Sequence, residues 1–93
     1  YPCLIVEVLS ESTEAYDRGK KFFRYRRNPQ LKDYILVSSQ EIAVDLYRKD
    51  PDERWDILNY REGEEIELRS VGLTVPIGQI YRGIDFSLGS AEF

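Results

Sequence analysis

The chain has 93 residues, of which 42% are hydrophobic and 32% are charged. This length suits one small domain, and the composition is that of a folded globular protein rather than a disordered one. The sequence contains one cysteine and no histidine, which excludes an internal disulfide, Cys/His zinc sites and hydrolases that depend on a catalytic histidine. Any acid–base or metal chemistry must therefore be done by Asp, Glu, Lys or Tyr, and an oxygen-ligand site of that kind suits Mg²⁺ or Mn²⁺.

The apolar runs indicate where the protein is located and how the chain is divided into domains. No run approaches the roughly 20 apolar residues of a membrane-spanning helix, so we expect no membrane association and a cytoplasmic location. We expect a single domain over residues 1–86. The last residues show no clear periodicity, and a disordered tail is expected over residues 87–93.

The first predicted element is a strand over residues 3–9 that contains one carboxylate. Its run of Leu, Ile and Val is typical of a strand buried on both faces, yet Glu7 lies in the middle of it. Burying an ionised carboxylate costs several kcal/mol unless a cation or a metal compensates it. The sequence therefore predicts a positive group close to Glu7.

The next predicted element is a basic helix from near Thr13 to about Arg27, where Asn28 and Pro29 end it. Residues 17–27 carry six basic side chains and one acid, a net charge of +5 in a chain whose net charge is −4. On a helical wheel one apolar stripe is expected to face the core, and we expect its glycine to permit a close approach to the sheet. The stripe contains Ala15, Tyr16, Gly19, Phe22 and Phe23.

The rest of the chain is rich in β signals. The apolar runs and turn residues predict strands over residues 33–38, 42–48, 54–60 and 65–68, a short extended piece over 71–75, and a helix that starts near Pro76. The fold class is therefore α/β (α+β): a mixed sheet with one crossover helix after the first strand and a C-terminal β-meander, with the first two strands parallel. One long helix covers one face of such a sheet, so we expect the other face to be covered by a missing segment or by the partner in a dimer.

The sequence resembles the Uma2 family (DUF820), which consists of restriction-endonuclease-like proteins in the PD-(D/E)xK nuclease superfamily. The most specific part of the resemblance is the pattern of Pro2, the strand from Leu4 to Ser10, Ser12-Thr13, Asp17, Lys21 and Tyr25. The segment from Lys32 to Val37, Gly63-Glu64 and the segment from Ser70 to Ile77 resemble later parts of the family, so that residues 2–83 are covered.

The resemblance implies a Mg²⁺- or Mn²⁺-dependent DNA endonuclease with a restriction-endonuclease-like fold. In this superfamily carboxylates hold the metal and a lysine stabilises the negative charge that develops on the phosphate. The resemblance maps Glu7 onto a catalytic metal ligand and Lys21 onto the catalytic lysine. Around this pair we expect phosphate binding by Lys20, Arg24 and Arg27 and supporting roles for Asp17 and Tyr25.

The sequence also departs from the pattern of the superfamily. The usual strand lysine is absent, because Leu9 occupies its position, and no acidic residue precedes Glu7. The chain therefore resembles the C-terminal part of a family member. The metal-binding Asp that the superfamily pattern places upstream of Glu7 is absent from it. We expect weak Mg²⁺ binding and little activity from this chain alone.

Several alternatives stay open at the level of the sequence. Glu7 could be paired with a helix lysine for structural reasons alone, and the helical wheel does not choose between Lys20 and Lys21. Asp17 suits an i,i+4 pair with Lys21, and Tyr25 suits packing. At the level of function, the alternative to a nuclease is a non-catalytic nuclease-like module that dimerises or binds a partner.

Overall fold

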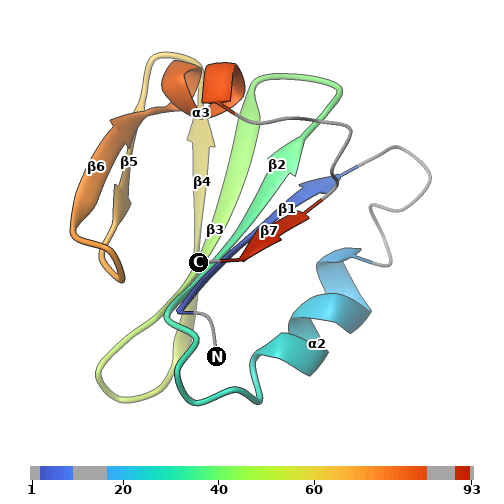
Figure 1. The fold of residues 1–93 in the computed structure, drawn as a ribbon, viewed down its shortest axis with the longest axis vertical. Helices are drawn as coiled ribbons and strands as arrows, with labels where there is room; N and C mark the ends of the chain where they lie inside the picture. Colours follow the sequence, from blue (N-terminus) through green and yellow to red (C-terminus); the bar gives the residue numbers. More distant parts are fainter. Residues whose placement is uncertain (1–2, 10–16, 84–89, 93) are drawn as a thin grey trace.

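The protein is built around a five-stranded mixed sheet (Figure 1). The computed structural model describes residues 3–9, 17–83 and 90–92. The strands lie in the order β4-β3-β2-β1-β7, where β1 is Leu4–Leu9, β2 Asp33–Ser38, β3 Ala43–Lys49, β4 Trp55–Arg61 and β7 Ser90–Glu92. Strands β1 and β2 are parallel and the other neighbours are antiparallel. The predicted mixed sheet is therefore confirmed, with each of the first four strand boundaries within one residue of its prediction.

Two short helical segments and a hairpin complete the fold. The π-helical turn η1 (Asp17–Lys21) continues into the α-helix α2 (Phe22–Tyr25) between β1 and β2. The hairpin β5 (Glu65–Leu68) and β6 (Leu73–Pro76) is followed by the helix α3 (Ile77–Gly83). None of the described helices is long and apolar enough to cross a lipid bilayer.

Strand alternation divides the core into two layers. One set of side chains, which includes Ile5, Leu36 and Tyr47, packs with Phe22 on the helix side of the sheet. The other set, which includes Leu4, Ile35 and Leu46, packs against β5, β6 and α3. Figure 1 shows α2 on one side of the sheet and the hairpin with α3 on the other. Since side chains alternate along a strand, the near-continuous apolar runs of β1 and β2 supply both layers.

The expectation that one face of the sheet lies bare is wrong. The β5–β6 hairpin folds back over that face, where Ile66 is 0% exposed and Ile77 is 2% exposed. The sequence predicted a strand over residues 65–68 and a short extended piece over residues 71–75, which the structure pairs as β5 and β6. The position of this hairpin over the sheet depends on contacts between distant segments. The argument for a missing segment or a dimer partner over this face therefore loses its basis.

In the described residues, a helical segment lies where the sequence predicted the basic helix, but its core-facing side differs from the prediction. Phe22 packs into the core, whereas Phe23 is 52% exposed and a Cβ atom at Gly19 would have open space around it. A close helix–sheet approach at Gly19 is therefore wrong. The physical reason is the π-helical turn η1, whose i→i+5 hydrogen bonds wind the backbone more loosely than the 3.6-residue period of the wheel. Ala15 and Tyr16 lie outside the described residues.

The expected tail over residues 87–93 contains a strand. Ser90–Glu92 forms β7, which pairs antiparallel with β1 in a register that sets Ser90 opposite Glu7. The other residues of this stretch lie outside the described part of the chain.

Candidate active site

Glu7 is a buried carboxylate in the middle of β1, on the helix side of the sheet. It alternates with Val6 and Val8, so that it shares its face with the buried Ile5 and Leu9 of the same strand and with Leu36 of β2 opposite. Its exposed fraction is 2%. A carboxylate in such apolar surroundings requires compensation by a positive group.

Lys21 provides the positive charge that the sequence required. Its Nζ atom lies 3.5 Å from Oε2 of Glu7. The side chain of Lys21 remains 33% exposed, so the pair has one buried partner and one partner that reaches solvent. The site is therefore charged, with Glu7 shielded from solvent and Lys21 in contact with it.

Lys21 is held over Glu7 by its neighbour in sequence. The ring of Phe22 packs 4.4 Å from Tyr47, 5.3 Å from Tyr34 and 5.1 Å from Trp55, measured between ring centroids. Such tilted and edge-to-face pairs add to the apolar burial. This aromatic cluster fixes the junction of η1 and α2 on the sheet, and with it the backbone that carries Lys21.

The other predicted site residues lie on the same helical segment as Lys21 or in the turn that follows it. Lys20, Arg24 and Arg27 are exposed on the helical segment. Tyr25 packs with its ring 5.8 Å from that of Tyr34, which agrees with the packing role expected for it. The side chain of Asp17 lies outside the part of the chain that the structure describes.

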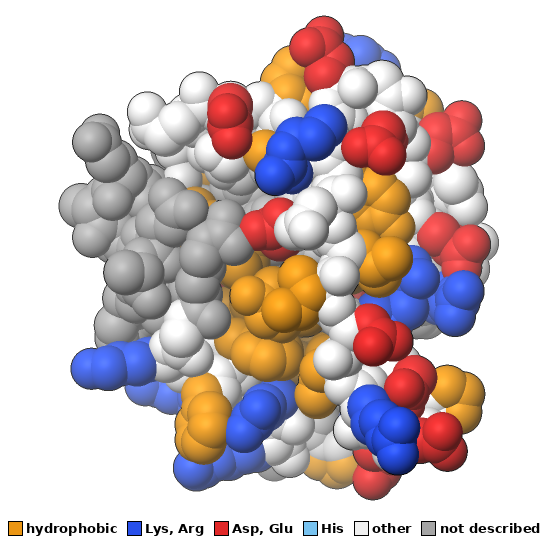
Figure 2. Space-filling model, turned by 180° about the vertical axis from the view of Figure 1, so that it is seen from behind, with side chains coloured by type: hydrophobic (Ala, Val, Ile, Leu, Met, Phe, Trp, Pro, Cys, Tyr) orange, Lys and Arg blue, Asp and Glu red, His pale blue; other side chains and the backbone are white. Residues whose placement is uncertain are grey.

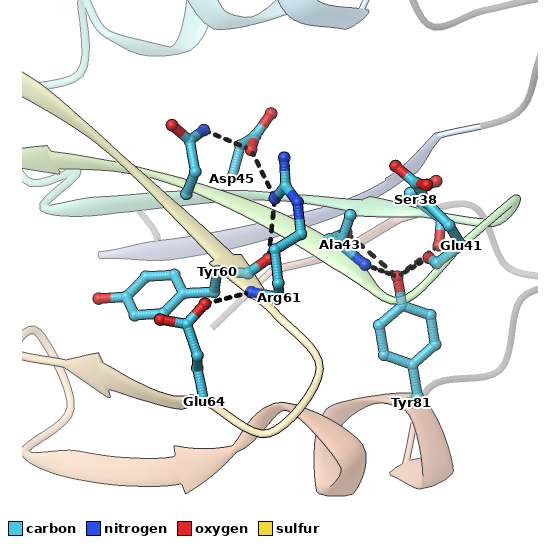
Figure 3. Close-up of polar contacts among 9 residues, drawn as sticks. Ser38, Glu41, Ala43, Asp45, Tyr60, Arg61, Glu64 and Tyr81 are labelled. Carbon is cyan, nitrogen blue, oxygen red and sulfur yellow. Dashed lines mark hydrogen bonds and ion pairs between the residues drawn. The ribbon is translucent and has the colours of Figure 1, made fainter.

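A second carboxylate, Asp45, lies on the same face of the sheet as Glu7. The register aligns Glu7 with Leu36 of β2, and Leu36 with Asp45 of β3. Asp45 is 8% exposed; its Oδ1 atom accepts a hydrogen bond of 2.7 Å from Asn59 and lies 4.0 Å from Nη1 of Arg61 (Figure 3). Sequence reasoning missed this residue, although a charged residue at an inward position of a predicted strand was a usable signal.

These residues fit one part of a metal site. Among the described residues no three carboxylate or thiol side chains come together as a ready metal cage. Mg²⁺ is commonly held by one or two carboxylates together with waters and substrate phosphates. Glu7 suits one such ligand, while the carboxylate of Asp45 already binds Asn59.

Comparison with known proteins decides the family of the chain. Residues 1–78 match the Uma2 family, whose description is "Putative restriction endonuclease". The chain belongs to the Uma2 family. The predicted resemblance is thus confirmed.

Two cyanobacterial relatives come from Synechocystis sp. (strain ATCC 27184 / PCC 6803 / Kazusa). The "Uncharacterized protein slr1290" is 57% identical over 86 residues, which is 92% of this chain and 45% of that protein. The "Uncharacterized protein sll1609" is 39% identical over 67 residues, which is 72% of this chain and 37% of that protein. The chain therefore spans less than half the length of each of these two relatives.

Proposed function

We propose that this chain carries one half of the catalytic site of a Mg²⁺-dependent DNA endonuclease of the Uma2 type. The observation that supports the proposal is the buried Glu7 with the ammonium group of Lys21 3.5 Å away. A carboxylate and a lysine at the edge of solvent are the two kinds of group that metal-dependent phosphodiester hydrolysis needs. Membership of a family described as "Putative restriction endonuclease" supports the reaction class of the proposal.

In this proposal the two residues have different tasks. Glu7 would be a ligand of Mg²⁺ or Mn²⁺, and a bound metal supplies polarisation of the phosphate and a lower pKa for the attacking water. Lys21 reaches solvent, so its ammonium group is accessible to a phosphate that approaches from that side. There it would stabilise the negative charge that develops on the phosphate oxygens.

The basic helix suggests how DNA would be held. Figure 2 shows basic side chains gathered over α2, and acidic side chains mostly toward the opposite edge of that view. Lys20, Arg24 and Arg27 are exposed there and would contact backbone phosphates. Such contacts predict an affinity that falls as the salt concentration rises, without sequence preference.

The complete activity is proposed for a protein of the length of the two relatives, of which this chain spans less than half. One described carboxylate at the site binds a divalent ion weakly, and a further metal ligand would come from the upstream segment that the superfamily pattern places before this strand. A non-catalytic module was the alternative, and the bare sheet face that favoured it is covered by the β5–β6 hairpin. A homodimer stays a prediction, and a mass measurement in solution would test it.

The test is DNA cleavage by a longer version of the protein that includes the upstream segment. We expect Mg²⁺-dependent cleavage, and a loss of at least about 100-fold in rate for Glu7→Gln and for Lys21→Ala, because each removes a group that acts on the transition state. Glu65→Gln, which neutralises an exposed carboxylate of β5, is the matched control and should keep the full rate. Undiminished cleavage by both site variants would contradict the proposal.

A further inference from the structure

A second polar site lies on the opposite face of the sheet from Glu7. Asp33 and Arg48 face each other across the first rung of β2 and β3, on the side that the hairpin covers. Together with the turn between β5 and β6 they border a pocket of about 280 Å³. Its lining residues are Lys32, Asp33, Arg48, Lys49, Arg69 and Ser70.

Three buried polar atoms of this pocket have no hydrogen-bond partner among the described residues. They are Oδ1 of Asp33, Nε of Arg48 and Oγ of Ser70. Asp33 is 0% exposed, and its other oxygen, Oδ2, accepts a hydrogen bond of 3.0 Å from the backbone N–H of Ser70. Nε of Arg48 lies 3.9 Å from Oδ1 of Asp33, which is too far for a hydrogen bond. Buried polar atoms are nearly always satisfied, so their convergence on one pocket points to a ligand.

The charge of the pocket indicates an anion. Four cationic side chains and one carboxylate line it, in a chain whose net charge is −4. Arg48 is oriented by the backbone carbonyl of Glu67, to which its Nη2 donates, and Arg69 pairs with the carboxylate of Glu67. Lys32 and Lys49 add charge at the rim.

Oδ1 of Asp33 forms an ion pair with Arg48 but accepts no hydrogen bond, and this open acceptor position refines the chemistry of the anion. Arg48 Nε–H and the Ser70 hydroxyl can donate to anion oxygens, but Oδ1 of Asp33 can only accept while it is ionised. An anion that carries its own proton satisfies both requirements. Hydrogen phosphate carries such a proton, whereas sulfate and a phosphodiester do not.

We propose that this pocket binds a phosphate group in a protonated form, with Asp33 accepting its proton in a hydrogen bond and Arg48 and Ser70 donating to its oxygens. Inorganic phosphate and the terminal phosphate of a nucleotide or nucleic acid share this chemistry. The site is separate from Glu7 and Lys21, so it stands whether or not the chain takes part in DNA cleavage.

The decisive experiment is calorimetric titration of the chain with inorganic phosphate and, in parallel, with sulfate at slightly acidic pH. We expect phosphate to bind at least about tenfold more tightly, because one hydrogen bond to a charged group distinguishes the two anions. An oligonucleotide with a 5′-phosphate and its unphosphorylated counterpart separate the two sources. Competition with inorganic phosphate by the phosphorylated strand alone identifies a terminal phosphate, while competition by neither strand identifies the free anion.

Variants give the proposal an internal check. Asp33→Asn should abolish the preference for phosphate, because the amide can donate to sulfate. Lys49→Gln should weaken phosphate binding several-fold. Arg82→Gln removes an exposed positive charge of α3 that does not line the pocket, and it should leave phosphate binding unchanged. If Asp33→Asn fails to fold, the comparison of Lys49→Gln with Arg82→Gln still tests the proposal. Equal affinity for phosphate and sulfate, no binding of phosphate, or equal competition by the unphosphorylated strand would overturn the proposal.

Discussion

At the scale of single residues, the burial of Glu7 determines what its neighbours must supply. The carboxylate is 2% exposed and its charge is compensated from Lys21, whose own side chain is one-third exposed. Because the side chain of Lys21 keeps contact with water, placing its charge there costs little free energy. The buried charge of Glu7, in contrast, depends strongly on the ion pair with Lys21. The pair is therefore asymmetric: replacing the lysine should lower the stability of the folded state more than replacing the acid.

This asymmetry predicts the effect of Lys21→Met on stability. The substitution removes the ion pair of Lys21 with a buried carboxylate and should lower the free energy of unfolding by about 1–3 kcal/mol. The measurement is urea unfolding at neutral pH. Arg24→Met, which removes an exposed cation from the same helical segment, is the control and should change the free energy by less than about 0.5 kcal/mol.

The double variant Glu7→Gln/Lys21→Met extends the same prediction. Once the acid is neutral, the missing lysine matters less, so the double variant should be more stable than Lys21→Met alone. A double variant whose loss equals the sum of the two single losses would show that the residues do not interact.

The requirement for a cation near Glu7 could be predicted from the sequence, since an apolar strand with one carboxylate makes it explicit. Asp45 could not be placed on the same face of the sheet as Glu7 in that way, because only the register of three strands aligns the two residues. The pocket on the other face was also missed. Its residues come from three segments, around positions 32–33, 48–49 and 69–70, and in each segment they look like ordinary surface charges.

At the scale of elements, the helical segment after β1 shows where the 3.6-residue period fails to predict which side chains face the core. The π-helical turn η1 changes the rotation of the chain before α2 begins, so that Phe22 reaches the core and Phe23 does not. The strands were easier to predict because their side chains alternate regularly and their apolar runs are flanked by turn residues.

The open space around Gly19 yields a prediction that distinguishes the structure from the wheel. A Cβ atom there meets nothing within 4 Å, so Gly19→Ala should stabilise the protein by about 0.5–1 kcal/mol by reducing the freedom of the unfolded chain. Thermal unfolding would show a higher midpoint.

Gly63→Ala is the contrasting variant for this experiment. Gly63 has a φ of +88° in the turn before β5, where an L side chain is strained, and its replacement should destabilise the protein. A lower melting midpoint for Gly19→Ala would mean that the helix approaches the sheet closely after all.

At the scale of the whole molecule, Tyr81 joins the hairpin layer to the main sheet. Its hydroxyl accepts a hydrogen bond of 3.1 Å from the backbone N–H of Ala43 and lies 2.6 Å from the carbonyl oxygens of Ser38 and Glu41 (Figure 3). One side chain from α3 thus satisfies backbone groups of the β2–β3 turn. Sequence patterns do not reveal such a link, because its partners lie about 40 residues apart.

Tyr81→Phe should therefore loosen the attachment of α3. The change leaves the N–H of Ala43 without this partner and should cost about 1–3 kcal/mol of stability. Urea unfolding measures this cost, and Tyr60→Phe on β4 provides a matched control. Equal small losses for both variants would contradict a special role for Tyr81.

The same residue makes stability depend on pH in the alkaline range. Burial, with a smaller contribution from Glu41, raises the pKa of Tyr81 above its ordinary value of 10.0. The folded state then keeps the proton to a higher pH than the unfolded chain, so this stabilisation is complete below about pH 10 and is lost as the pH rises through the folded pKa. The loss should be weaker in Tyr81→Phe, as followed by unfolding at a series of alkaline pH values.

The central claim, that Glu7 is a metal ligand beside Lys21, is tested most directly by paramagnetic NMR on this chain. Small additions of Mn²⁺ should broaden the amide signals of residues next to Glu7 on β1 and of Leu36 across from it, even if the ion binds weakly. The same additions to Glu7→Gln should leave those signals sharp. Broadening confined to the exposed acids of β4 and β5, or identical broadening in Glu7→Gln, would contradict the account.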